Sequence, residues 1–221
     1  MNSPAKSRPL RWAEITLDSL SEALAEHAEE AGTSVGLDLR ADAYGFGVAV
    51  VAPLATQHGF SRAVLSDGTG RAGLDHDDAD ADASWVQRAH AHRAMTLCAQ
   101  VINSKQVPGG TEVSYGGRYR TAGSTHLALV SIGFADGVPR LDPIGGFVEA
   151  RDTRFPVAGR IAMDQLIVDT GDAALSLGET VTVWGGRVSL GEWATWSRRP
   201  LELLSAGLGS RVDTTIVELR S

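Results

Sequence analysis

The stretch LDLRADAYGFG, from Leu37 to Gly47, contains the side chains of the N-terminal part that are best suited to catalysis or ligand binding. An apolar run leads into a polar loop, and scaffolds commonly present functional side chains on such loops. Arg40 and Tyr44 could bind an anion or donate hydrogen bonds there. A guanidinium with a pKa above about 12 cannot serve as the nucleophile or base that a lysine amine would provide.

Lysine is scarce in this chain. Of the 20 lysine and arginine residues, only Lys6 and Lys105 are lysines. Lys6 lies close to the N-terminus and Lys105 lies in the polar segment NSKQVPGG, and we expect both at the surface because lysine is rarely buried. Chemistry that requires a lysine amine would have to use one of these two side chains.

A second group of candidate residues lies in the C-terminal half. Tyr115 stands in VSYGGRY, Phe134 in GFADGVPR and Met163 in GRIAMDQ. Glycine and aspartate in these segments are typical of turns. We therefore expect these side chains on turns between strands.

An acidic run from Asp75 to Ser84 raises the question of metal binding. The candidate oxygen and nitrogen donors are Asp75, Asp77, Asp78, Asp80, Asp82, His76, His90 and His92. The run lacks the glycine-anchored loop and the closing glutamate of an EF-hand. We therefore expect residues 75–92 to form a solvated acidic linker, with one or two helical turns from Trp85 to Ala91, and no metal site.

Hydrophobic periodicity predicts a small α/β piece over residues 1–74. The expected elements alternate: a strand at 12–17, a helix from Ser19 to Gly32, a strand at 34–39, a helix at 48–58 and a strand at 62–67. Strands that alternate with helices through short loops are expected to be parallel. A sheet this small has open edges. We therefore expect it to pack against the following domain, against a second subunit, or against both.

From residue 93 the pattern changes. Segments rich in Val, Ile, Thr and Leu recur at short intervals between Gly and Pro, which predicts a β barrel or sandwich over residues 93–221. The predicted fold class is therefore α+β, with a small parallel βαβ unit preceding an all-β domain.

Composition narrows the class of protein. A net charge of -7 argues against binding to nucleic acid, which requires basic residues. No apolar run approaches the roughly 20 residues of a membrane span, and the N-terminus has no signal-peptide pattern. The single cysteine, Cys98, fits a reducing compartment. We expect a cytoplasmic protein that binds neither nucleic acid nor membrane.

Five motifs, taken in order, resemble those of alanine racemases. WAEITLDSL resembles the opening strand and helix of that family, and RADAYGFG resembles its cofactor-lysine motif. VSYGGRY, GFADGVPR and GRIAMDQ resemble three later motifs. The resemblance implies a (β/α)8 barrel followed by a β domain, a head-to-tail dimer, and pyridoxal 5'-phosphate (PLP) bound as a Schiff base to a barrel lysine.

The resemblance also implies roles for single residues. Arg40 takes the place of the cofactor lysine, and Tyr115 takes that of a catalytic tyrosine, which serves the site of the other subunit. Tyr44 matches a contact to the cofactor phosphate. Met163 matches a substrate-carboxylate contact, and Phe134 replaces a tyrosine of the substrate entryway. Most of the barrel, expected between about residues 70 and 93, is missing.

These departures predict a shortened, catalytically inactive relative that binds no PLP and forms a homodimer. It would act as an interaction or regulatory module, or be a remnant. We expect Arg40 to pair with Asp42 or with an acidic group of a partner. Two alternatives stay open: a racemase active only in a heterodimer with a full-length homologue, to which it donates Tyr115, or a protein that binds a small anion or amino acid through Arg40 and Tyr44.

Overall fold

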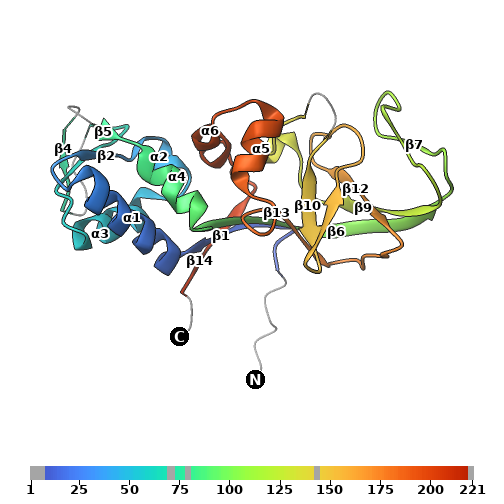
Figure 1. The fold of residues 1–221 in the computed structure, drawn as a ribbon, viewed down its shortest axis with the longest axis horizontal. Helices are drawn as coiled ribbons and strands as arrows, with labels where there is room; N and C mark the ends of the chain where they lie inside the picture. The colour runs from blue at the N-terminus through green and yellow to red at the C-terminus, as the bar shows by residue number, and fades with distance from the viewer. Residues whose placement is uncertain (1–7, 69–72, 78–80, 142–144, 219–221) are drawn as a thin grey trace, which may run out of the picture.

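The computed structural model describes residues 8–68, 73–77, 81–141 and 145–218. Its two main sheets lie one after the other along the longest axis of the molecule (Figure 1). The small parallel sheet and its helices form one end, and the β-rich part extends to the other. The predicted α+β class, with a small parallel unit and a β domain, is confirmed.

The parallel sheet has the strand order β4-β3-β2-β5. Its strands are β2 (Gly36–Asp38), β3 (Arg62–Val64), β4 (Asp75–His76) and β5 (Ala81–Asp82). The helices at this end are α1 (Leu17–Ala31), α3 (Val48–Gln57) and α4 (Ser84–Ala91). In α1, Leu20, Leu24 and His27 recur at helical spacing on the buried face, and the helix packs on α4 and α3.

The larger sheet has eight strands, with the path β11-β10-β13-β6-β1-β14 and a branch from β6 through β9 to β12. Its strands are β1 (Arg11–Thr16), β6 (Met95–Val107), β9 (Thr125–Val130), β10 (Phe147–Ala150), β11 (Thr153–Pro156), β12 (Leu166–Gly171), β13 (Thr180–Trp184) and β14 (Asp213–Val217). The long strand β6 pairs with three neighbours, β1, β13 and β9, and so organises the whole sheet.

Shorter elements complete the described part. They are the segment α2 (Arg40–Tyr44), the hairpin β7 (Glu112–Val113) and β8 (Tyr119–Arg120), the 3-10 turn η1 (Phe134–Asp136), and the helices α5 (Leu190–Ser197) and α6 (Leu201–Ala206). Helix α5 begins at a capping box, in which Ser189 Oγ accepts from Glu192 N at 3.1 Å.

The first strand does not join the parallel sheet, so that prediction is wrong. Strand β1 pairs antiparallel with β6 and parallel with β14, and Trp12 lies opposite both Cys98 and Asp213. The alternation of buried residues identifies a strand but not the sheet that it enters, because the pairing partners lie far away in the chain.

Residues 75–92 are not a solvated linker where the structure describes them. Strands β4 and β5 form the two edges of the parallel sheet, and α4 buries Trp85 and Val86 completely. Edge strands tolerate charged side chains because one side of the strand faces solvent, which is compatible with their aspartates. Residues 78–80 lie outside the described part. The helical turns expected from Trp85 to Ala91 correspond to α4.

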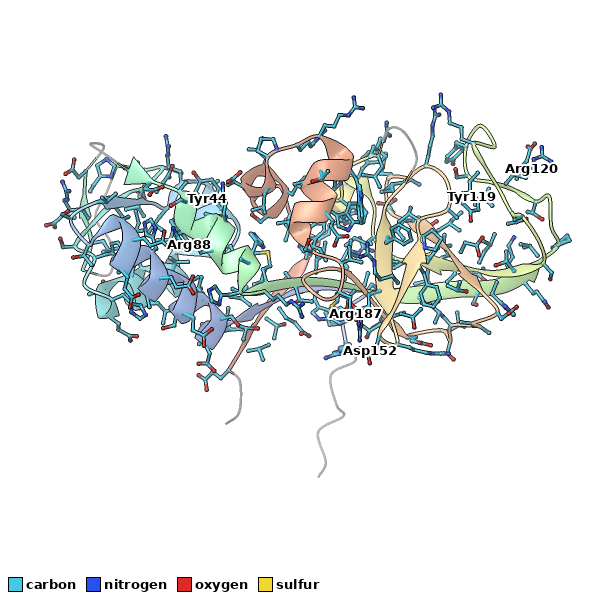
Figure 2. All side chains as sticks on the ribbon, in the orientation of Figure 1. Tyr44, Arg88, Tyr119, Arg120, Asp152 and Arg187 are labelled. Carbon is cyan, nitrogen blue, oxygen red and sulfur yellow. The ribbon has the colours of Figure 1, made fainter. Side chains whose placement is uncertain are left out.

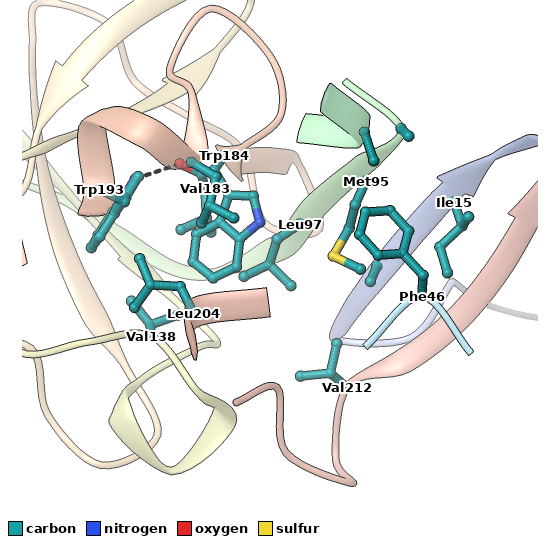
Figure 3. Close-up of a cluster of buried hydrophobic side chains, with 14 of the residues drawn as sticks. Ile15, Phe46, Met95, Leu97, Val138, Val183, Trp184, Trp193, Leu204 and Val212 are labelled. Carbon is teal, nitrogen blue, oxygen red and sulfur yellow. Dashed lines mark hydrogen bonds between the residues drawn. The ribbon is translucent and has the colours of Figure 1, made fainter. Parts of the chain in front are cut away.

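One hydrophobic core runs through both parts of the chain. Figure 3 shows Phe46, from the α/β part, beside Met95 of β6 and Ile15 of β1. Further along the core, the indole of Trp193 donates a hydrogen bond to the carbonyl oxygen of Val183 at 2.8 Å. The small parallel unit therefore packs against the β domain of its own chain.

Candidate functional site

The loop after β2 closes on a buried carboxylate. The Asp38 side chain is 4% exposed and accepts two hydrogen bonds from the Arg40 guanidinium. Nε donates to Oδ1 at 3.0 Å, and Nη2 donates to Oδ2 at 2.6 Å. The Tyr44 hydroxyl donates to Oδ2 at 2.7 Å, and the backbone N–H of Arg40 donates to Oδ1 at 3.0 Å. The expected pairing of Arg40 with Asp42 is therefore wrong: Asp42 Oδ1 instead accepts the backbone N–H of Val48 at 2.9 Å.

These contacts shift three pKa values together. Burial opposes ionisation of Asp38, but its hydrogen bonds from Arg40 and Tyr44 outweigh burial and hold the pKa of the carboxyl below its usual range. Burial and the bond to Asp38 raise the pKa of Tyr44 to about 12. The bond to Asp38 also raises the pKa of Arg40. All three groups are thus fixed in the charge states that favour the cluster.

The backbone of this loop is a left-handed turn. Ala41, Asp42 and Ala43 have φ of 52° and Tyr44 has φ of 55°. Each such residue costs on the order of 1 kcal/mol or more. The turn is held by hydrogen bonds from Gly45 N to the carbonyl oxygens of Ala41 and Asp42, both at 3.2 Å. It places the side chains of Arg40 and Tyr44 on the same carboxylate.

Helix α6 packs directly against this turn. Gly45 has φ of +87°, and a Cβ there would collide with the backbone carbonyl of Ser205. Glu202 lies close enough to contribute to the raised pKa of Tyr44, and it accepts a hydrogen bond from Gln87 Nε2 at 2.9 Å. The C-terminal helix thus forms one wall of the Arg40 region.

The residues of this loop do not fit PLP. The cavity beside the loop is only about 230 Å³, and its described lining carries the carboxylates of Asp42 and Asp67 and no basic side chain. Such a lining repels a phosphate. In the described part of the chain the one lysine is Lys105, which lies on β6 in the other half of the molecule.

The second candidate group forms a much larger cavity in the β domain. Tyr115, Phe134 and Met163 all line this cavity of about 850 Å³, together with Arg118, Arg140, Leu141, Arg160, Ile161, Ala162, Asp164 and Gln165. Tyr115 is 78% exposed and Met163 is 56% exposed. Three of the five predicted site residues are therefore brought together.

Backbone contacts between loops shape this cavity. Ser114, with φ of 63°, accepts the backbone N–H of Arg160 on its Oγ at 2.7 Å. The N–H groups of Phe134 and Ala135 donate to the carbonyl oxygens of Ala162 and Met163 at 3.0 and 2.9 Å. These bonds tie together the turns that carry the three aromatic and thioether side chains.

An ion cluster around the buried carboxylate of Asp136 supports the same turns. Asp136 is fully buried, and its carboxylate lies 2.9 Å from both Arg11 Nη1 and Arg211 Nη2. It also accepts a hydrogen bond from the backbone N–H of Gly133 at 2.9 Å. Arg211 also bonds to Asp164 at 2.7 Å. Removing one partner of a buried charge network is strongly destabilising, so this cluster fixes η1 relative to β1.

The two candidate groups are separate within one chain. None of the described residues that line the large cavity comes from the Arg40 loop. Tyr44 and Tyr119, the latter in the strand that follows the Tyr115 turn, lie in opposite parts of the molecule (Figure 2). Among the described residues, no group of three His, Cys, Asp or Glu side chains could hold a metal ion.

Two features of these sites were missed by sequence reasoning. Asp38 accepts hydrogen bonds from both Arg40 and Tyr44. Its position at the end of an apolar strand was the sequence feature that could have identified it as part of the site. Arg118, Arg140 and Arg160 lie within the motifs that were recognised, but their convergence on one cavity depends on the fold.

None of the helices in the described part combines the length and the apolar character that a membrane span requires.

The β-rich part is a domain of a defined family. Residues 94–216 match the family described as "Alanine racemase, C-terminal domain". The chain therefore belongs to the alanine racemase family, as the motifs indicated.

Individual relatives agree with this assignment. The alanine racemase of Salinispora tropica is 40% identical over 105 residues, 46% of this chain and 28% of that protein. The alanine racemase of Streptomyces coelicolor is 40% identical over 127 residues, 56% of this chain and 32% of that protein. The chain thus spans only about a third of the length of the curated relatives it matches.

Solved structures share the fold over both parts. An alanine racemase from Streptomyces coelicolor A3(2) superposes with a TM-score of 0.74 at 20% identity, covering 94% of this chain and 98% of that chain. An alanine racemase from Bartonella henselae, with covalently bound pyridoxal phosphate, gives a TM-score of 0.75 at 17% identity, covering 95% of this chain and all of that chain.

Proposed function

We propose that this chain is a shortened alanine racemase relative that does not racemise alanine and acts through its β domain as an interaction or regulatory module. The observation that carries this proposal is the hydrogen bonding of the Arg40 side chain. The guanidinium at the position of the cofactor lysine is bonded to buried Asp38, and it cannot form the Schiff base that the family chemistry requires.

The size of the parallel unit supports the same proposal. Its sheet has four strands in the described residues, whereas the family resemblance implies a closed barrel of eight. The short strands leave β4 and β5 as edges, and the cavity beside Arg40 is small and acidic. Positioning of substrate and cofactor supplies a large share of enzymatic rate enhancement, and the four parallel strands of the described residues provide only part of the framework for it.

A racemisation assay tests the loss of activity. Purified protein is incubated with D-alanine and added PLP, and formation of L-alanine is measured. We expect no turnover above that of a heat-denatured sample. PLP-dependent turnover that is abolished in Tyr115→Phe would overturn the proposal, because that pattern would require a working site built around Tyr115.

A second function is favoured by the exposure of Tyr115. This side chain is 78% exposed at the rim of a cavity that also holds Met163, so another chain could receive its hydroxyl. On this reading the protein contributes Tyr115 to a full-length racemase in a mixed dimer. Mixing it with a full-length racemase that lacks its own catalytic tyrosine should then restore racemisation, and the Tyr115→Phe chain should not.

A further inference from the structure

Strand β14 is the open end of the eight-stranded sheet in the described part of the chain. It pairs only with β1, in parallel, and its register over Asp213–Val217 has no shift. The other end of the sheet closes on itself, because β11 meets β12. Val157, next to β11, bridges to Val168, and the N–H of Ala158 donates to the carbonyl oxygen of Ile167 at 2.7 Å. Among the described residues, no strand takes up the hydrogen-bonding groups on the outer side of β14.

This edge lacks the usual protection against strand pairing. Edge strands are ordinarily guarded by lysine, by proline, by a bulge or by very short length. Strand β14 is five residues long and regular, and it contains neither lysine nor proline. Four of its residues, Thr214 to Val217, are β-branched, which favours the extended backbone. In Figure 1 the strand runs to the lower margin of the ribbon, away from α5 and α6.

The hydrophobic core ends one strand before this edge. Ile15 of β1 lies directly opposite Ile216 of β14, and side chains opposite each other on paired strands share a face. Ile15 is fully buried, whereas Ile216 is 43% exposed. A further strand beside β14 would place a side chain next to Ile216 and extend the apolar face that Ile15 begins.

The charge around the edge indicates what kind of strand fits it. Asp213 begins β14 and Glu218 follows its end, and both are exposed. In the described part of the chain neither carboxylate forms an ion pair. The nearby guanidinium of Arg211 is already engaged, at 2.9 Å from Asp136 and 2.7 Å from Asp164. The edge is therefore uncharged in its middle and negative at both ends.

We propose that β14 is a docking edge for an extended segment of a partner protein, which adds to the sheet as a further strand. Backbone hydrogen bonds supply affinity in such complexes, and alternate side chains supply specificity. The segment has β-branched or apolar residues in its middle and a lysine or arginine at each end. The inference rests on the proposed interaction function and names its surface, which is separate from the cavities described above.

Fluorescence anisotropy with labelled peptides tests the partner chemistry. The first peptide is short and alternates valine and threonine between terminal lysines. We expect it to bind saturably, with a Kd below about 1 mM. Glutamates in place of the lysines should weaken binding at least about fivefold, and prolines in place of the threonines should abolish it, because proline cannot donate to a sheet. No binding of the first peptide, or equal binding of any two of the peptides, would overturn the proposal.

Matched variants and hydrogen exchange locate the site. Ile216→Lys places a like charge on the edge and should weaken binding of the first peptide at least about fivefold. Leu177→Lys is the control, because Leu177 is 71% exposed and lies between β12 and β13, away from β14. In the parent chain the peptide should protect amides of residues 213–217 from exchange. Equal losses in the two variants, or protection at the Tyr115 turn instead, would refute the assignment.

The same variants separate other occupants of the edge. The mass of the peptide-free protein by light scattering should be the same in Ile216→Lys and in the parent chain. A lower mass in Ile216→Lys would assign the edge to a second copy and overturn the proposal. Absence of peptide binding with no racemisation would refute the docking edge alone. Peptide binding together with racemisation would instead refute the proposed loss of activity.

Discussion

The guanidinium of Arg40 lies in a bidentate bond to the carboxylate of Asp38, with Nε 3.0 Å from Oδ1 and Nη2 2.6 Å from Oδ2. The carboxylate is 4% exposed, whereas the arginine side chain is 59% exposed. The two residues stand on either side of Leu39, at the end of β2. The residue that the motif resemblance aligns with a cofactor lysine is therefore part of an ion pair with Asp38 in this chain.

Asp38→Asn should destabilise the protein. The substitution removes the charge that accepts bonds from Arg40 and Tyr44 and leaves donors with poorer partners, so we expect a loss of about 1–3 kcal/mol in the free energy of unfolding. Chemical denaturation measures this loss. Asp172→Asn changes an exposed aspartate in the same way and should shift stability by less than about 0.5 kcal/mol. Equal effects of the two variants would show that the Asp38 cluster contributes nothing.

Gly45→Ala should loosen the contact between the Arg40 turn and α6. A Cβ at Gly45 meets the carbonyl of Ser205, and φ there is +87°. Gly110 provides a matched control, because its φ is +80° but no atom lies within 4 Å of the position that a Cβ would take there. We expect Gly45→Ala to lower the free energy of unfolding by at least about 2 kcal/mol more than Gly110→Ala does. Similar losses would mean that α6 adjusts without cost.

Stability should fall in mild acid because of buried histidine. Burial lowers the pKa of His90 to about 3 from the ordinary 6.5, and burial also lowers the pKa of His27 despite the nearby Asp82. The unfolded state then binds more protons than the folded state between pH 6.5 and pH 3. The contribution of neutral His90 is thus complete above pH 6.5 and is lost as the pH falls towards 3, by about 5 kcal/mol at most.

Denaturation curves at pH 7.5, about 6 and about 5 measure this effect. His90→Leu should show a shallower decline in the free energy of unfolding than the parent chain. Parallel declines in the His90→Leu variant and the parent would refute a role for His90.

The protein should be a dimer in solution. In the described residues, β4 and β5 pair on one side only, and Tyr115 and Met163 are exposed. Unpaired edges and exposed apolar side chains favour association, most commonly with two-fold symmetry and with more than about 1,000 Å² buried. Light scattering at micromolar concentration should give about twice the chain mass of 23.3 kDa.

A monodisperse monomer in that experiment would contradict the dimer. Hydrogen exchange should further show protection on concentrating the protein in the loop 40–47 or the turn at Tyr115. A dimer that leaves both segments freely exchanging would show that the family arrangement was lost with the barrel.

Sequence patterns predicted the large divisions of the fold because burial alternates within single elements. Strand β1 shows the limit of this reasoning. Its alternation is clear, but its partners β6 and β14 begin at Met95 and Asp213, and no local pattern specifies them. The acidic run was assigned to a linker because charge dominates its composition, whereas edge strands can carry that charge toward solvent.

The candidate sites show a similar limit. The motifs identified Tyr115, Phe134 and Met163, and the fold brings them to one cavity. The left-handed turn from Ala41 to Tyr44 could not be predicted, because alanine and tyrosine do not favour that backbone region. The bond from Arg40 to Asp38 depends on that turn, and the convergence of Arg118, Arg140 and Arg160 on one cavity depends on contacts between distant loops.

The most direct test of the account is whether PLP forms a reducible covalent adduct with this chain. Protein is incubated with PLP, dialysed, reduced with borohydride and weighed by intact mass spectrometry, alongside a full-length racemase as a positive control and the Arg40→Lys variant. We predict that the parent chain keeps its unmodified mass and that Arg40→Lys gains no racemisation. A stoichiometric, dialysis-resistant adduct on the parent chain, or measurable racemisation by Arg40→Lys, would contradict the account.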